Sequence, residues 1–161
     1  MPKYWRLIIK IIRHELSITE TDHRSQYFEE INHKGDIFFD PDIGLDARKT
    51  RVSKSKLPKY ITCQELMDQL YAHHSVLVMV YQHIHSRITS ERVDEIICIL
   101  KERFPKIRFS CLIYESSSVA MLIFSLNNGR IRNAMGKFKL VFGNHMKNRI
   151  RLRTSEKPSE I

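Results

Sequence analysis

The segment TCQELMDQLYAHHSVLVMVYQHIHSRITSERVDEIICILKERFPKIRFSCLIY, residues 62–114, contains most of the signals that decide the fold. Thr62 and Glu65 have the spacing of a capping box, and apolar residues follow at helical spacing, which predicts a helix over 62–72. The β-rich apolar run 76–84 then predicts a central strand buried on both faces. The segment therefore starts with a helix followed by a strand.

The second half of this segment repeats the pattern. A helix is expected to begin at Thr89 or Ser90 and to end at Pro105, because apolar residues lie on one stripe: Val93, Ile96, Ile97, Leu100 and Phe104. Residues 107–114 alternate in character and predict a second strand. If the strands 76–84 and 107–114 are parallel neighbours, their connection should be a right-handed crossover.

Towards the C-terminus three further elements are expected. Residues 119–126 form a third apolar run, whose composition favours a strand, although a helix ending at Asn128 and Gly129 is the alternative. The next apolar residues lie on one helical stripe: Ile131, Ala134, Met135, Phe138 and Phe142. Residues 149–153 alternate between arginine and aliphatic residues, as in a strand. The order is therefore α-β-α-β-β-α-β, which predicts the α+β class, with a mixed sheet of about four strands and helices packed against it.

The N-terminal part has a different texture. Residues 3–16 form an amphipathic helical pattern with basic residues opposite the apolar stripe, suited to packing on a partner or on the domain, or to acting as a targeting or membrane-surface helix. Residues 17–60 are polar and predict an extended N-terminal arm that ends in a basic linker. We therefore expect an N-terminal region over 1–60, an α/β nucleic-acid-binding domain over 61–153 and a polar tail over 154–161.

Length and composition limit the class of protein. The 161 residues are 42% hydrophobic, which suits one core and excludes collagen-like and disordered chains. Three cysteines without a CxxC pair argue against a disulfide framework and favour a reducing, intracellular compartment, either the mitochondrial matrix or the cytoplasm. The longest apolar run, 76–81, is far shorter than the ~20 residues of a membrane span, so none is expected.

Charge is segregated along the chain. The formal net charge is +9, and two acid-free segments, 47–64 and 116–155, carry 14 of the 27 basic residues. These 14 are the candidate nucleic-acid-binding residues: Arg48, Lys49, Arg51, Lys54, Lys56, Lys59, Arg130, Arg132, Lys137, Lys139, Lys147, Arg149, Arg151 and Arg153. By contrast, nine acids and two basic residues lie in 15–46, a segment that should face away from a polyanion or contact the basic segments.

The predicted terminal strand is the most specific candidate site. Arg149, Arg151 and Arg153 would lie on one face, about 6.8 Å apart, which suits contacts to successive phosphates of a nucleic acid strand. The alternative is an edge strand protected from aggregation by its charge. Phe138 and Phe142 lie on the apolar stripe, so we expect them in the core and assign the affinity to the basic residues.

No motif supports catalysis. His83 and His85 would share one strand face, but no acidic or cysteine ligand lies near them in sequence. Asp40, Asp42 and Asp46 resemble a fragment of a calcium loop, without the glycine and glutamate that an EF-hand needs. No phosphate loop, serine elbow or paired zinc motif is present. We therefore expect neither an enzyme nor a bound metal or cofactor.

Two family resemblances point to nucleic acid. The order of elements in ELMDQLYAHHSVLVMVYQHIHSRITSERVDEIICILKERFPKIRF, residues 65–109, and the turn LVFGNH, residues 140–145, resemble the globular domain of the large-subunit ribosomal stalk-base proteins. This resemblance implies a non-enzymatic structural protein that binds rRNA among other proteins of a large ribonucleoprotein assembly, most simply a mitochondrial-type ribosome. The chain departs from the family at Tyr114 and Glu115, where a Lys-Asn pair is usual.

The rival resemblance uses SVAMLIFSLNNGRIRNAMGKFK, residues 118–139, which is similar to the third strand and following helix of the origin-binding domains of viral replication initiators. Nuclease members of that group have paired histidines where this chain has Val119 and Met121, so the resemblance implies a DNA-binding module of a viral or plasmid system without nicking activity. A protein-protein adaptor with a basic surface is the third alternative.

Overall fold

The computed structural model describes residues 35–48, 53–72, 74, 76–84, 89–142 and 148–155, together with Arg24 and Phe28. The helix expected over 3–16 and the tail beyond Ser155 lie outside the described residues. The elements, in chain order, are β1 (Ile37–Phe39), β2 (Gly44–Asp46), the 3-10 helix η2 (Lys54–Lys59), β3 (Tyr60–Thr62), α2 (Cys63–Ala72), β4 (Val78–His83), α3 (Thr89–Arg103), β5 (Ser110–Glu115), β6 (Val119–Ser125), α4 (Asn128–Phe142) and β7 (Ile150–Thr154).

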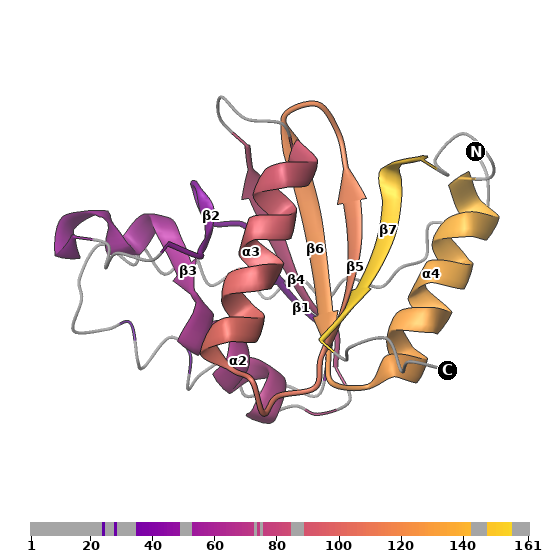
Figure 1. Cartoon of the computed structure of the whole chain (residues 1–161), viewed down its shortest axis with the longest axis horizontal. Coiled ribbons are helices and arrows are strands. Elements are labelled where there is room, and N and C mark those ends of the chain that lie inside the picture. The colour runs from indigo at the N-terminus through magenta and orange to yellow at the C-terminus, as the bar shows by residue number, and fades with distance from the viewer. Residues whose placement is uncertain are drawn as a thin grey trace.

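A mixed five-stranded sheet with the order β1-β4-β6-β5-β7 forms the centre of the molecule (Figure 1). β1 runs parallel to β4, and the other neighbours are antiparallel. β2 and β3 form a small parallel sheet beside it. The predicted α+β class is confirmed. Residues 119–126, for which the sequence allowed either a strand or a helix, contain strand β6.

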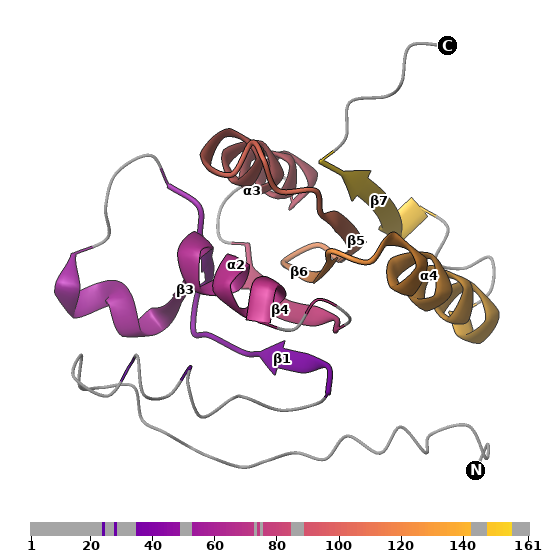
Figure 2. The same cartoon turned by 90° about the horizontal axis from the view of Figure 1, so that it is seen from below.

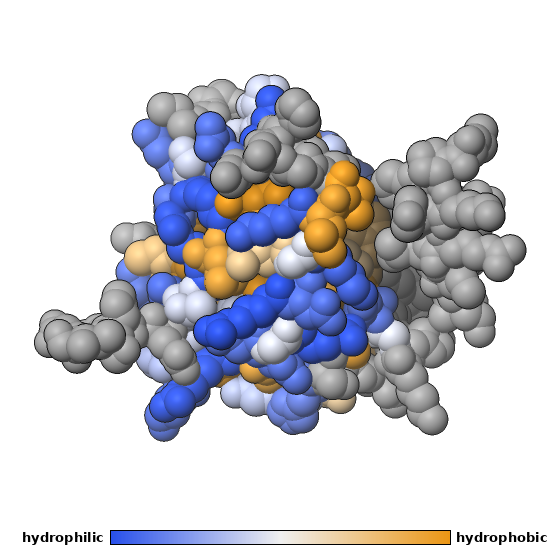
Figure 3. All heavy atoms as spheres, turned by 90° about the vertical axis from the view of Figure 1, so that its right-hand side faces the viewer, coloured by the Kyte–Doolittle hydropathy of each residue, from blue (hydrophilic) through white to orange (hydrophobic). Residues whose placement is uncertain are grey.

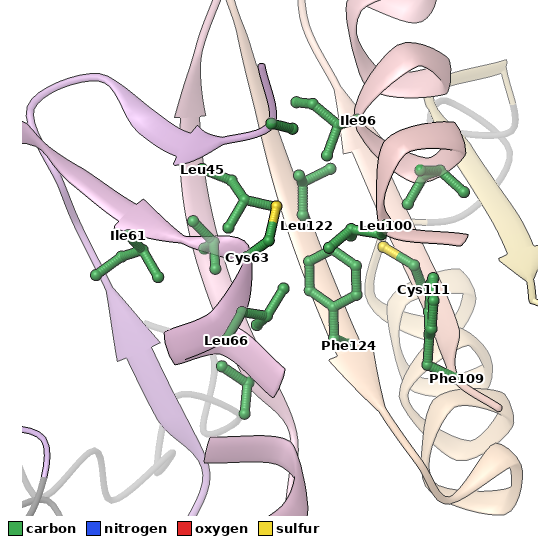
Figure 4. Packing of buried hydrophobic residues seen from close by; sticks show 14 of the residues in the cluster. Leu45, Ile61, Cys63, Leu66, Ile96, Leu100, Phe109, Cys111, Leu122 and Phe124 are labelled. Atoms are coloured by element: carbon green, nitrogen blue, oxygen red, sulfur yellow. The ribbon is translucent and has the colours of Figure 1, made fainter. Parts of the chain in front are cut away.

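Helices cover both faces of the sheet (Figure 2). α2 and α3 pack on one face, where the large core includes Leu66, Val80, Ile96, Leu100 and Phe124 (Figure 4). α4 packs on the other face, over Leu112 and Ile123. The sheet therefore has a large buried core under α2 and α3 on one face and a smaller core under α4 on the other.

The chain path explains why α3 and α4 lie on opposite faces. β4 and β5 are parallel but have β6 between them, so they are not the direct neighbours considered from sequence. β6 and β7 are likewise parallel to each other, with β5 between them, and they run antiparallel to β4 and β5. Both connections cross the sheet in the same direction, so right-handed crossovers require their helices to be on opposite faces, as Figure 2 shows.

The predicted extended arm needs correction. Ile37 and Phe39 of β1 are buried in the large core, and β1 supplies the fifth strand of a sheet expected to have about four. Arg24 also contacts the folded part, with its Nη2 atom 2.7 Å from Oε2 of Glu65 and 2.6 Å from the carbonyl oxygen of Tyr60. Sequence missed β1 because three residues are too few to display a strand period.

Glu65 also confirms the predicted capping box at the start of α2. Its backbone N–H donates to Oγ1 of Thr62 at 3.2 Å, and its side-chain Oε2 accepts from the N–H of Thr62 at 2.8 Å. The same carboxylate therefore caps a helix and binds Arg24, because an ionised carboxylate accepts several hydrogen bonds.

Gly44 joins the small sheet to the large one. It has a φ of +123°, a conformation that other residues rarely adopt, and a Cβ atom there would lie 2.4 Å from Oε1 of Gln82. That close approach lets Gln82 accept from the N–H of Leu45 at 2.8 Å and donate to the carbonyl of Ile43 at 3.0 Å. The buried amide of Gln82 thereby fixes β2 against β4.

Candidate nucleic-acid interface

α4 is held to the sheet by a narrow apolar stripe. Asn127 caps the helix, with its Oδ1 atom accepting from the N–H of Arg130 at 3.2 Å. Ile131 is fully buried, and Ala134, Met135 and Phe138 pack partly buried beside it. The placement of Phe138 agrees with its predicted core position, whereas nothing is described for the side chain of Phe142. This stripe leaves the remaining sides of α4 facing solvent.

The four basic residues of α4 are all exposed: Arg130, Arg132, Lys137 and Lys139. Arg130 forms an ion pair with Asp36, with 2.6 Å between Nη2 and Oδ1. The other three form no ion pair with any residue that the structure describes, and α4 itself contains no acid. Within the described part of the chain, α4 therefore presents three uncompensated positive charges.

These basic residues lie on two flanks of the helix. At 3.6 residues per turn, positions 130 and 137 share one side of the apolar stripe, and positions 132 and 139 share the other. The ion pair with Asp36, which immediately precedes β1, shows that the first flank faces β1 and β4. The second flank consequently faces the β7 end of the sheet.

β7 corrects the most specific sequence prediction. Ile150 and Leu152 face α4, so Arg151 and Arg153 lie on the opposite face of the sheet, beside α3. Arg151 contacts Glu115 of β5 and lies 3.2 Å from Asp94 of α3, and Arg153 lies 3.2 Å from the same Asp94. The guanidinium groups are thus neutralised by acids 36 to 59 residues away in sequence.

Arg149 precedes β7, is exposed and has no ion pair among the described residues. It is the one member of the predicted arginine triad whose charge stays uncompensated within the described part of the chain. The three arginines therefore do not form the row of free guanidinium groups expected from their spacing.

The pKa of Asp94 reflects this pairing. Burial by itself would raise it, but hydrogen bonds from Arg153 and Arg151 hold the pKa of Asp94 below its ordinary value. Burial would likewise lower the pKa of Arg151, but hydrogen bonds with Glu115 and Asp94 raise it. Arg151 and Asp94 are accordingly charged partners of each other at neutral pH.

The first basic segment lies elsewhere. Lys54, Lys56 and Lys59 are exposed on η2, and Lys59 is 3.8 Å from Asp42. Figures 1 and 2 both place η2 and α4 at opposite ends of the molecule. The two basic segments therefore do not share one face.

Arg48, the other described candidate of the first segment, is engaged within the fold. Arg48 forms an ion pair with Asp46 at 3.0 Å and lies over the Tyr60 ring, 4.7 Å from its centroid. Three further candidates lie outside the described residues: Lys49, Arg51 and Lys147.

The residues considered for metal binding do not converge. His83 is half-buried on β4 with its ring 4.9 Å from that of Tyr81, and His85 lies outside the described residues. Asp46 is used by Arg48, whereas Asp42 is exposed. Within the described ranges, no three His, Cys, Asp or Glu side chains are grouped so as to hold a metal ion.

One surface was missed by sequence reasoning. β4 was predicted to be buried on both faces, but burial alternates along it: Val78, Val80 and Gln82 are buried, and the intervening side chains are half-buried. On that second face, Phe38 of β1 is 51% exposed. Tyr81 and His83 at the end of the run were the available signal, because alternate polar groups there suit a half-solvated strand face.

Figure 3 shows the α4 side of the molecule, where apolar surface lies between bands of polar surface. In the part of the chain that the structure describes, no helix is long and apolar enough to cross a membrane. A scan of protein-family models and searches of curated proteins and of solved structures found no match to this chain, so the two family resemblances stay predictions and the geometry of α4 carries the argument.

Proposed function

We propose that this protein binds RNA through α4, as a non-enzymatic component of a ribonucleoprotein assembly, with a mitochondrial-type ribosomal particle as the first candidate from its sequence resemblance. The observation that carries the proposal is a set of three basic side chains on α4 that have no acidic partner among the described residues: Arg132, Lys137 and Lys139. They project from a helix that the fully buried Ile131 fixes to the sheet.

Electrostatics support this use of α4. The segment 116–155 contains no acid. Asp94 and Glu115, which lie near β7 in space, form ion pairs with Arg151 and Arg153 on the opposite face of the sheet. A phosphate chain approaching α4 would therefore meet cations without local repulsion. Three phosphate contacts on a single strand would release counterions with a salt slope of about −2.

The first experiment measures the salt dependence of RNA binding by fluorescence anisotropy with the full chain. The variant R132A/K137A/K139A should reduce the slope of log Kd against log salt by about 2. The variant K54A/K56A/K59A on η2 removes the same charge and is the matched control, expected to leave the slope unchanged. Equal slopes for the two variants would refute α4 as the binding surface.

The second experiment separates RNA from the other candidates. The native protein is sedimented with and without nuclease treatment. Migration with a large particle that is lost after ribonuclease supports the proposal. Loss after deoxyribonuclease alone would instead support the DNA-binding module, and indifference to both nucleases would support the protein adaptor.

A further inference from the structure

Among the residues that the structure describes, no helix covers half of one sheet face. α4 packs against β5 and β6, and on the same side no helix of the described residues lies beside β1 and β4 (Figure 2). A helix is about 10 Å across and strands are about 4.8 Å apart, so one helix covers roughly two strands of a five-stranded face. The uncovered half includes Phe38 and Tyr81, and it is bordered by Met79 and Met121, which pack partly buried against the cluster under α4.

Two aromatic rings lie on this uncovered half. Phe38 is paired with Met79, and Tyr81 lies two residues farther along β4, on the same face. Strand spacing and rise place the backbones of Phe38 and Tyr81 about 8 Å apart. The ring of Tyr81 has an edge-on contact with His83, 4.9 Å between centroids. The surface therefore offers two aromatic rings, one of them packed against a neighbouring ring.

Positive charge borders the same surface. Arg130 and Lys137 occupy the flank of α4 that faces β1 and β4. Arg130 neutralises Asp36, the acid at the start of β1, and Lys137 has no ion pair within the described residues. An apolar face with aromatic rings thus lies directly beside a cationic helix flank.

This combination matches a single strand of nucleic acid. Bases that are not paired expose flat apolar faces that stack on aromatic side chains, and the phosphates that join them require cations at the side. A duplex buries its bases and would use only the cationic flank. A purely apolar protein partner would gain nothing from Lys137.

We infer that the uncovered half of the sheet is a stacking platform for two unpaired bases of a single-stranded RNA, on Phe38 and Tyr81, whose phosphates follow the α4 flank at Lys137. The inference rests on the proposed function, because it uses the same helix. It adds that the bound RNA is single-stranded at this site.

The test compares a 12-nucleotide single-stranded RNA with the same RNA annealed to its complement, using the full chain. F38A and Y81A should each weaken single-strand binding about 10-fold, the effect of losing one stacked base, without changing the salt slope. Duplex binding should stay unchanged. The matched control is Y71A, because Tyr71 is a 47% exposed tyrosine on α2, on the other side of the sheet, and its loss should have no effect.

A second pair of variants separates stacking from folding. Tyr81→Phe retains the ring and should bind like the wild type, whereas Tyr81→Leu retains apolar bulk without a ring and should bind like Tyr81→Ala. Equal binding by the Phe and Leu variants would overturn the inference. A change in sedimentation of the RNA-free protein with Tyr81→Leu would assign the face to a second copy of the chain and also overturn it.

The outcomes distinguish this inference from the proposed function. If F38A/Y81A binds single strands like the wild type while R132A/K137A/K139A still lowers the salt slope, the stacking platform is refuted and RNA binding by α4 stands. If the wild type binds neither form of RNA, both proposals fail.

Discussion

α4 and β7 come from the same acid-free segment, 116–155, yet their positive charges have different surroundings. The side chains of Arg132, Lys137 and Lys139 on α4 meet no acid among the described residues. Arg151 and Arg153 on β7 meet Asp94 and Glu115. An acid-free segment therefore supplies cations, while the neighbours in space decide whether those cations are available to a polyanion.

The largest expected effect concerns the attachment of α4. Ile131→Ala should lower the free energy of unfolding by about 2 to 5 kcal/mol, because Ile131 is fully buried beneath the helix. Leu140, 86% exposed on the same helix, is the matched control, and its change to Ala should cost less than about 0.5 kcal/mol. Urea denaturation measures both. Equal losses would mean that α4 is not anchored by this stripe.

Replacing an arginine should affect the free energy of unfolding more on β7 than on α4. Arg151→Ala leaves the carboxylate of Glu115, only 12% exposed, without its partner, so we expect a loss of about 1 to 3 kcal/mol in unfolding free energy. Arg132→Ala on α4 should change it by less than about 0.5 kcal/mol. Thermal or urea unfolding tests the pair. A stable Arg151→Ala protein would show that β7 does not need its ion pairs.

The pH dependence of stability should carry the signature of Asp94. Its pKa is lower in the folded state than in the unfolded chain, so its contribution is present above the unfolded value near 4 and is lost as the pH falls through the folded value. The side chain is 46% exposed, so the contribution should be below about 1 kcal/mol. The difference in unfolding free energy between wild type and Asp94→Asn should shrink from pH 6 to pH 3. A constant difference would contradict the pairing.

The smallest expected effect comes from releasing the arginines of β7 from their acidic partner, so that they resemble the unpaired cations of α4. Asp94→Asn frees Arg153 and part of the charge of Arg151, and should steepen the salt slope of RNA binding by at most about 1. Anisotropy titrations measure this slope. Asp68→Asn, on the exposed side of α2, changes the net charge equally and is the control. Identical slopes for the two variants would show that position near β7 does not matter.

Sequence patterns predicted α2, α3, α4 and the four longer strands because each has enough residues to display its period. The capping box at Thr62 and the stop at Pro105 set boundaries that α2 and α3 follow within a few residues. The strands β1, β2 and β3 were not predicted because each has only three residues, and η2 lies in the segment predicted as a basic linker. The two-sided burial predicted for the run 76–84 was wrong because apolar composition reports a strand but not how many helices cover it.

Residue order by itself determined the elements, the apolar stripe of α4 and the supply of positive charge, since these depend on local periodicity and composition. Tertiary structure alone decided which cations are free and which sheet face is open. The reason is topological: two right-handed crossovers running the same way across the sheet, from strands of opposite direction, separate α3 from α4. That separation brings Asp94 and Glu115 to the arginines of β7, and it makes α4 the one described helix on a face too wide for a single helix.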